Sequence, residues 1–207
     1  KIVIAFSPPP FSILPHSPIS SRCGSVASLF SPSQMAARVV CQLAAAVKPA
    51  AAVNPVHYAA MRRFFEMDKE DSTFTGLVWN ARITNVEERK LSAEFLVTKS
   101  KIQHFGTLHG GCTATMIDCL TCAAVIVATG RAAVTVNLAL SCMAPAKLGT
   151  LVRIDAKVTR VGKSLVYTTA NLVRADNGIE IASANHIMAF HNKAYVREMD
   201  DREFNFR

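Results

Sequence analysis

Apolar side chains occupy almost every position between residues 112 and 128, a stretch with no Gly, no Pro and one charged residue, Asp118. A surface helix carries a wide polar face, so this pattern predicts a helix enclosed by the rest of the protein. The motif His109-Gly110-Gly111 precedes it, and Gly130 is a typical C-terminal stop. The few polar positions form one narrow stripe because they are three or four residues apart; they are Gly111, Thr115, Asp118, Thr121 and Cys122.

Alternating apolar and polar positions, typical of β-strands, lie on both sides of this central helix. Before it, residues 76–86 and 90–98 are separated by a short charged turn and predict a hairpin. After it, turn sequences such as Asp176-Asn177-Gly178 separate four more predicted strands, at residues 133–143, 151–161, 165–175 and 179–191. A first helix is predicted over residues 54–67. We therefore expect an α+β fold, with an antiparallel sheet of about six strands wrapped around one long central helix.

The chain divides into three parts by composition. Residues 1–52 are rich in Ser, Pro, Ala and basic side chains and lack acidic ones, which is typical of an organellar transit peptide. Met35 begins a shorter stretch that would also make a presequence, and both starting points are open. No uninterrupted apolar run in this part reaches the length of a membrane span. Residues 53–192 form the predicted domain, and residues 193–207 form a charged tail.

Net charge argues against one class of partner. The chain carries +8, but six of its 23 Lys and Arg residues and none of its 15 Asp and Glu residues lie in residues 1–65. The remainder holds 17 basic and 15 acidic side chains, and no aromatic residues interleave with basic runs. We therefore expect no nucleic-acid partner.

The cysteines predict neither a metal site nor a disulfide framework. Cys119 and Cys122 have CxxC spacing, but they fall inside the central helix with no second pair or His nearby. Their position favours small buried hydrophobic residues, with a thiol nucleophile at Cys122 as the alternative. Four of the six cysteines fall in predicted helix or strand cores, which suits a reducing compartment; the six are Cys23, Cys41, Cys112, Cys119, Cys122 and Cys142.

Asp118 and the glycine pair are the candidate chemical groups. No Lys, Arg or His lies three or four residues from Asp118, and burying an unpaired carboxylate is costly. Asp118 therefore either lies on a stripe that faces water or lines a cleft as a base or nucleophile. Gly110 and Gly111 lack Cβ atoms, so a ligand can approach the free N–H groups of the first helical turn. The helix dipole there favours an oxygen that gains negative charge, which predicts an acyl-transfer site.

Helix geometry adds a constraint on this site. Gly110 and Asp118 are eight residues apart, which is about 12 Å along one helix. A carboxylate side chain spans only a few Å, so one copy of the chain cannot place both groups on one carbonyl. We therefore expect a two-fold dimer in which the partner's helix supplies the second group.

Residues 106–118 and 143–149 resemble the motifs of the hotdog-fold acyl-CoA thioesterases, most of all the PaaI-like group. The resemblance covers residues 53–192 and implies a hotdog fold. It also implies that the Gly110 N–H polarises the thioester carbonyl and that His109 fixes the loop and contacts the thioester region. Asp118 of the partner subunit would activate water or attack directly.

The resemblance extends to weaker candidates. Gln103 and Thr135 stand where related thioesterases have Asn and Ser, and each keeps a polar group that would orient water or the carbonyl. Gly111, Lys147 and Lys163 are candidate substrate contacts, with the lysines placed in turns to meet coenzyme A phosphates or to remain solvated. We expect the other histidines, His104, His186 and His191, to be structural.

The expected function is therefore hydrolysis of fatty acyl-CoA in the mitochondrial matrix by a homodimer or homotetramer. The apolar wall beside Asp118, formed by Met116, Ile117 and Leu120, favours fatty acyl chains. Water is the second substrate, so no cofactor and no metal are expected. The alternative is a catalytically silent hotdog domain that serves as a structural subunit of a larger mitochondrial assembly; a hydratase ranks below both.

Overall fold

The computed structural model describes residues 3–4, 47–67, 74–75 and 80–191. Residues 1–2 and 5–46 of the predicted transit peptide, the predicted tail and residues 76–79 of the first predicted strand lie outside the described residues. Residues 47–191 belong to one compact unit.

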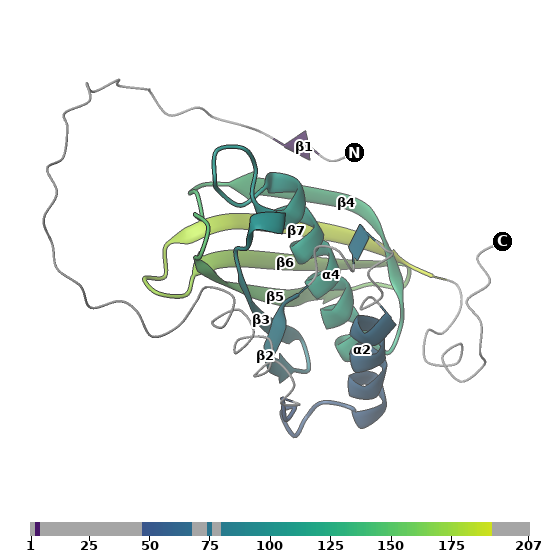
Figure 1. The fold of residues 1–207 in the computed structure, drawn as a ribbon. Coiled ribbons are helices and arrows are strands. Elements are labelled where there is room, and N and C mark those ends of the chain that lie inside the picture. The colour runs from purple at the N-terminus through teal and green to yellow at the C-terminus, as the bar shows by residue number, and fades with distance from the viewer. Residues whose placement is uncertain (1–2, 5–46, 68–73, 76–79, 192–207) are drawn as a thin grey trace, which may run out of the picture. The chain divides into compact units, whose positions relative to one another are not determined.

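One antiparallel sheet of six strands forms the body of this unit (Figure 1). Its order is β4-β7-β6-β5-β3-β2, and the two-residue strand β1 (Val3–Ile4) pairs in parallel with β4. The six strands are β2 (Arg82–Glu87), β3 (Lys90–Leu96), β4 (Ala133–Cys142), β5 (Leu151–Val161), β6 (Leu165–Arg174) and β7 (Glu180–Phe190). The predicted order of elements along the chain, a helix, two strands, the long helix and four strands, is confirmed. The antiparallel neighbours β6 and β7 are joined through a turn at Gly178, whose φ is 72°.

The central helix is α4 (Gly110–Thr129), which lies across one face of the sheet (Figure 1). Most of its apolar side chains are buried, and Met116, Ile117 and Leu120 are among the completely enclosed ones. By length and composition α4 could also cross a membrane. Its apolar surface is instead covered by the strands and by α2 (Pro55–Met67), so the all-round hydrophobicity has a local explanation.

Both ends of α4 are closed by neighbouring residues. At the C-terminal end, Gly130 adopts a left-handed conformation with φ of 65° and donates its N–H to the Ile126 carbonyl. The His57 ring of α2 lies 3.1 Å from the Val127 carbonyl oxygen through Nδ1. This helix end is therefore tied to α2, and the predicted glycine stop is confirmed.

The segment that precedes α2 also packs on this unit. Asn54 accepts the Val56 N–H at 2.9 Å and so caps α2. Upstream, the Ala50 N–H donates to the Val86 carbonyl at 2.9 Å, and Tyr58 donates its hydroxyl to the Val47 carbonyl. Residues 47–52 thus contact the domain as well, ahead of its predicted start at residue 53.

An irregularity in β4 determines which residues face α4. The pairing with β7 shifts between Thr135 and Asn137, so Val136 is an extra residue in the strand. Side chains alternate along a strand, and an inserted residue reverses the alternation on one side of it. Thr135 therefore turns toward α4, whereas Val134 and Val136 are 56% and 51% exposed.

Candidate active site

The loop before α4 is held in place mainly by backbone hydrogen bonds. The Leu108 N–H donates to the Ala146 carbonyl at 2.8 Å, and the Leu148 N–H donates to the Gly106 carbonyl at 3.1 Å. Residues 106–108 are thereby joined to the turn that follows β4. The His109 N–H donates to the Lys101 carbonyl at 2.8 Å, which fixes the point where the chain enters α4.

His109 is the N-cap residue of α4. Its Nδ1 atom accepts the Gly111 N–H at 2.9 Å, so this nitrogen carries no proton and the neutral ring is protonated at Nε2. The Nε2–H group is consequently the free donor of an exposed side chain. This cap occupies the Gly111 amide, so the two glycines differ in what they can offer a ligand.

The Gly110 amide is the open donor at the start of α4. No acceptor for its N–H is found among the described residues. A Cβ atom added to Gly110 would meet no other heavy atom within 4 Å, whereas one at Gly111 would lie 3.1 Å from His109 Nδ1. The packing of a single chain therefore explains the glycine at 111 but not the one at 110.

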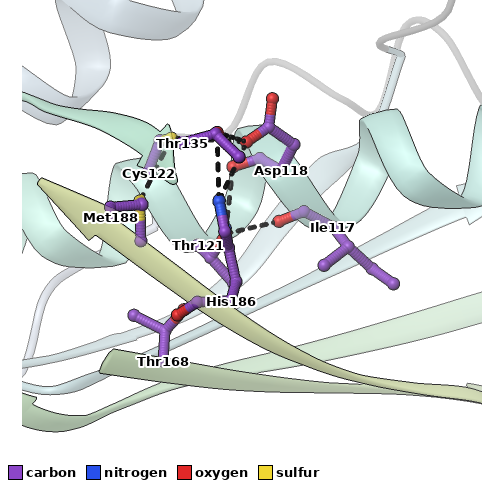
Figure 2. Close-up of polar contacts among 8 residues, drawn as sticks. All are labelled: Ile117, Asp118, Thr121, Cys122, Thr135, Thr168, His186 and Met188. Atoms are coloured by element: carbon purple, nitrogen blue, oxygen red, sulfur yellow. Dashed lines mark hydrogen bonds and ion pairs between the residues drawn. The ribbon is translucent and has the colours of Figure 1, made fainter. Parts of the chain in front are cut away.

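Asp118 lies two turns further along α4 and is held by a hydroxyl group. Thr135 donates its Oγ1–H to Asp118 Oδ1 at 3.0 Å, and the Cys122 thiol lies 3.7 Å from the same oxygen (Figure 2). The Asp118 side chain is 43% exposed, so its carboxylate can reach a substrate from solvent. The β4 irregularity and the helix stripe together create this contact between residues 17 positions apart.

His186, which is expected from the sequence to be structural, completes the group of polar side chains around Asp118. It lies on β7 with an exposed fraction of 0%. Its Nδ1 is 2.7 Å from Thr121 Oγ1, its Nε2 is 3.0 Å from Thr135 Oγ1 and 3.6 Å from Asp118 Oδ1 (Figure 2). Burial lowers the pKa of His186, and the nearby Asp118 carboxylate opposes this shift less strongly. His186 is therefore neutral at pH 7, and its contact with Asp118 is not an ion pair.

One sequence signal points to His186. It occupies the same face of its strand as Ala184 and Met188, which are buried against α4. A histidine among small and apolar residues on an inward face must find polar partners for both ring nitrogens. Thr121 lies on the polar stripe of the central helix and supplies one of them.

The remaining candidates lie apart from Asp118 in one chain. Gln103 donates from Nε2 to Thr107 Oγ1 at 3.0 Å, within the loop that leads to Gly110. Lys147 pairs through its backbone with Thr107 in an isolated bridge, and its side chain is exposed. Lys163 is exposed in the turn between β5 and β6. No ion pair or hydrogen bond joins these three side chains to Asp118 within the described part of the chain.

None of the cysteines in the described part of the chain forms a disulfide. Burial raises the pKa of Cys112, and burial lowers the pKa of its neighbour Lys101, so this pair is not an activated thiolate with its cation. Cys142 is exposed, contrary to the expectation of a strand core, because it lies at the end of β4. No cluster of three metal-ligating side chains occurs among the described residues.

Comparison with known proteins identifies the family to which this chain belongs. The family model of the thioesterase superfamily matches residues 105–181, which include all of α4 with Asp118 and the strands β4, β5 and β6. Over 128 residues the chain is 30% identical to acyl-coenzyme A thioesterase 13 of Homo sapiens, covering 61% of this chain and 91% of that protein. The chain belongs to the thioesterase superfamily.

Solved structures of thioesterase superfamily proteins share the fold. The crystal structure of zebra fish thioesterase superfamily member 2 aligns with a TM-score of 0.60 and 27% identity, over 62% of this chain and 94% of that chain. The PaaI protein of E. coli aligns with a TM-score of 0.54 and 16% identity, over 64% of this chain and 97% of that chain.

Both alignments support the hotdog fold, an antiparallel sheet around one long helix, that the sequence predicts. The chain is therefore a hotdog-fold member of the thioesterase superfamily, and its relatives support a thioester hydrolase.

Proposed function

We propose that this protein hydrolyses fatty acyl-CoA thioesters to a free fatty acid and coenzyme A. One observation carries the proposal: a carboxylate on an otherwise apolar helix, Asp118, is oriented by Thr135 and remains open to solvent. Membership of the thioesterase superfamily, whose relatives include acyl-coenzyme A thioesterase 13, supports the choice of substrate.

Asp118 supplies the group that makes hydrolysis possible. As a base it removes a proton from water, whose oxygen then attacks the thioester carbon; as a nucleophile its own oxygen attacks and water hydrolyses the resulting anhydride. In both routes the carbon–sulfur bond breaks and coenzyme A leaves as a thiol after protonation. Thr135 holds Oδ1 in place, so the second carboxylate oxygen is directed at the substrate.

The Gly110 N–H stabilises the negative charge that develops on the thioester oxygen. It lies at the positive end of the α4 dipole and has no acceptor among the described residues. The Nε2–H of His109 is a second donor beside it, because Nδ1 is occupied by the Gly111 amide. Gln103 contributes from the preceding loop, where its carboxamide is held by Thr107.

A complete site requires two copies of the chain. Gly110 and Asp118 lie on one continuous helix, about 12 Å apart by helical rise. Asp118 of one subunit therefore serves the Gly110 amide of the other, in a homodimer or in a tetramer of two such dimers. Exposed Val134 and Val136, on either side of Thr135 in β4, give this surface an apolar character suited to a second copy.

The proposal also covers the substrate contacts and the cellular location of the protein. The expected apolar wall of Met116, Ile117 and Leu120 is fully enclosed in the core, so these side chains offer no surface to an acyl chain. The choice of a fatty acyl chain therefore rests on the family resemblance, and Gly111 remains a candidate substrate contact at the start of α4. Exposed Lys147 and Lys163 are the candidate contacts for coenzyme A phosphates. The mitochondrial matrix remains the proposed location, with neither cofactor nor metal.

The test is release of free coenzyme A from a panel of acyl-CoA chain lengths by the wild type and by Asp118→Asn. We expect the variant to lose at least ~100-fold in kcat, the usual effect of removing a general base or nucleophile. Asp155→Asn is the matched control, because Asp155 lies on β5 and bonds to Ser92 and Arg153 instead. A folded, dimeric wild type that hydrolyses no acyl-CoA would favour the structural-subunit alternative.

A further inference from the structure

Four side chains form a continuous line of hydrogen bonds that begins inside the protein and ends at Asp118. Thr121 Oγ1, His186, Thr135 Oγ1 and Asp118 Oδ1 are joined by contacts of 2.7, 3.0 and 3.0 Å (Figure 2). The first two residues are fully enclosed, and Thr135 and Asp118 lie at the surface of the site. The buried half of this line has no part in the hydrolysis described above.

The number of protons in the line limits how it can be arranged. The Thr135 hydroxyl has one hydrogen, which it can donate to Asp118 Oδ1 or to His186 Nε2 but not to both. If Nε2 carries a hydrogen, it donates to Thr135, and the Thr135 hydrogen is left for Asp118. If Nδ1 carries the hydrogen instead, Nε2 accepts from Thr135 and the carboxylate loses its donor.

The charge of Asp118 decides between these two tautomers. A bare Nε2 lone pair would face the negatively charged Oδ1 at 3.6 Å, whereas an Nε2–H presents a positive hydrogen to the same region. The hydrogen bond from Thr135 to a carboxylate is also charge-assisted and stronger than one to a neutral ring. At the other end of the line, Nδ1 then needs a donor, and the Thr121 hydroxyl donates its hydrogen to Nδ1. The Ile117 carbonyl, which could also accept this hydrogen, still accepts a backbone N–H within the helix.

We propose that His186 is a positioning residue of the thioesterase site: its neutral Nε2–H tautomer turns the Thr135 hydroxyl onto Asp118. The direction of donation runs from Thr121 through His186 and Thr135 to the carboxylate. His186 neither gains nor loses a proton in this role, and it does not touch the substrate. The proposal rests on the proposed function only for its effect on rate, because the tautomer is a property of the folded protein itself.

The first test is nitrogen NMR of the full chain with ¹⁵N-labelled histidine near pH 7.5. His186 is assigned by the signals that disappear in His186→Gln. We expect a protonated Nε2 and an unprotonated Nδ1 for His186. A protonated Nδ1 with a bare Nε2 would overturn the proposal, whether or not the protein hydrolyses any thioester.

The second test is kinetic and compares two replacements of the ring. The Gln side chain in His186→Gln can place an N–H near the position of Nε2, whereas His186→Leu cannot donate at all. We expect His186→Leu to lose about 10- to 100-fold in kcat, the range for a hydrogen bond to a charged group, and His186→Gln to recover much of it. Thr168→Val is the matched control. Among the described contacts, the Thr168 hydroxyl donates only to the His186 backbone carbonyl, so it does not belong to the line of side-chain hydrogen bonds.

A double-mutant cycle shows whether His186 acts through Thr135. In a Thr135→Val background the hydroxyl is already absent, so His186→Leu should cost little further activity. Folding of each variant is checked by circular dichroism and by its oligomeric state. A folded His186→Leu with wild-type kcat, or losses that simply multiply in the double variant, would contradict the proposal. An inactive wild type would refute the proposed function and leave the tautomer measurement to decide this inference.

Discussion

Gly110 and Gly111 are adjacent at the start of α4, but their missing side chains have different consequences. A Cβ atom at position 111 would lie only 3.1 Å from Nδ1 of the His109 ring, so the glycine there avoids a close contact within the chain. Gly110 leaves a space that no atom of the same chain occupies within 4 Å of an added Cβ. A glycine that its own fold does not require is best explained by a ligand or a second subunit that approaches the backbone.

Because of this difference, we expect different effects from Gly110→Ala and Gly111→Ala, each of which adds one methyl group. Gly110→Ala should fold with the stability of the wild type or up to about 1 kcal/mol more, because Ala is the better helix former. Its kcat/KM should fall by ~10-fold or more, because the methyl group would occupy the space proposed for the thioester oxygen. Gly111→Ala should instead lower the melting temperature, since it disturbs the N-cap. Full activity in Gly110→Ala would remove the oxyanion role from this amide.

The buried ring of His186 predicts a loss of stability in acid. Burial lowers the pKa of His186 below its ordinary value near 6.5, with the opposing effect of the Asp118 carboxylate, the charged group that faces it from α4. Below about pH 6.5 the unfolded chain therefore binds a proton that the folded chain does not. The free energy of unfolding must fall as the pH decreases through this range.

The measurement is urea unfolding at several values between pH 7.5 and pH 5 for the wild type and for His186→Gln. The neighbouring Cys122 thiol and the exposed histidines are unchanged between the two proteins, so the difference isolates His186. We expect the wild type to lose more stability on acidification than the variant. Equal losses would mean that His186 is not held neutral by its surroundings.

Among the elements, α4 has an end whose geometry only glycine satisfies. Gly130 has φ of +65°, and a Cβ there would lie 2.5 Å from His57 Nε2. Gly178 has a similar φ of +72° in the turn between β6 and β7 but no heavy atom within 4 Å of an added Cβ. The two positions therefore separate the cost of a left-handed conformation from the cost of a steric clash.

We expect Gly178→Ala to lower the free energy of unfolding by about 1 kcal/mol, the cost of the left-handed conformation alone. Gly130→Ala should cost at least about 1 kcal/mol more, because the His57 ring must also move. Denaturant unfolding measures both, and adding His57→Ala to Gly130→Ala should recover part of the excess. Equal losses of unfolding free energy in Gly130→Ala and Gly178→Ala would show that the His57 ring on α2 moves aside without a measurable cost.

The elements themselves were predictable from sequence because each has a strong local signal. The apolar run of α4, the alternation of the strands and Gly130 and Gly178 at the predicted stops place the helix and the strands within a few residues. The extra residue in β4 was not predictable, because Val136 fits the alternation equally well with or without a shift in its pairing with β7. That shift is what turns Thr135 toward Asp118.

The candidate site was predictable in part for the same reason. Asp118 and Gly110 depart from local expectations, one as a charge in an apolar helix and the other as a glycine at its start. His186 gives a weaker signal, a polar ring on the inward face of a strand, which does not by itself indicate a role in the site. Its importance arises only when the fold brings Thr121, Thr135 and Asp118 within hydrogen-bonding distance or close to it.

At the scale of the whole molecule, the length of α4 makes one chain insufficient for the proposed chemistry. Gly110 and Asp118 are about two turns apart on one helix, so the model of a shared site predicts a specific result when two defective chains are combined. A dimer of one Asp118→Asn chain and one Gly110→Ala chain contains one site with both native groups and one site with neither.

The two chains can be co-expressed with different affinity tags, and the mixed dimers isolated by sequential purification. Light scattering establishes that the purified species is a dimer or a tetramer. We expect the mixed dimers to recover about half of the wild-type kcat/KM per dimer, against ~10% or less for either parent homodimer, because one of two symmetric sites is intact. If each chain built its own site, both sites of the mixed dimer would carry one defect and no activity would return. Recovery therefore separates a site shared between subunits from a dimer that merely places two complete sites side by side.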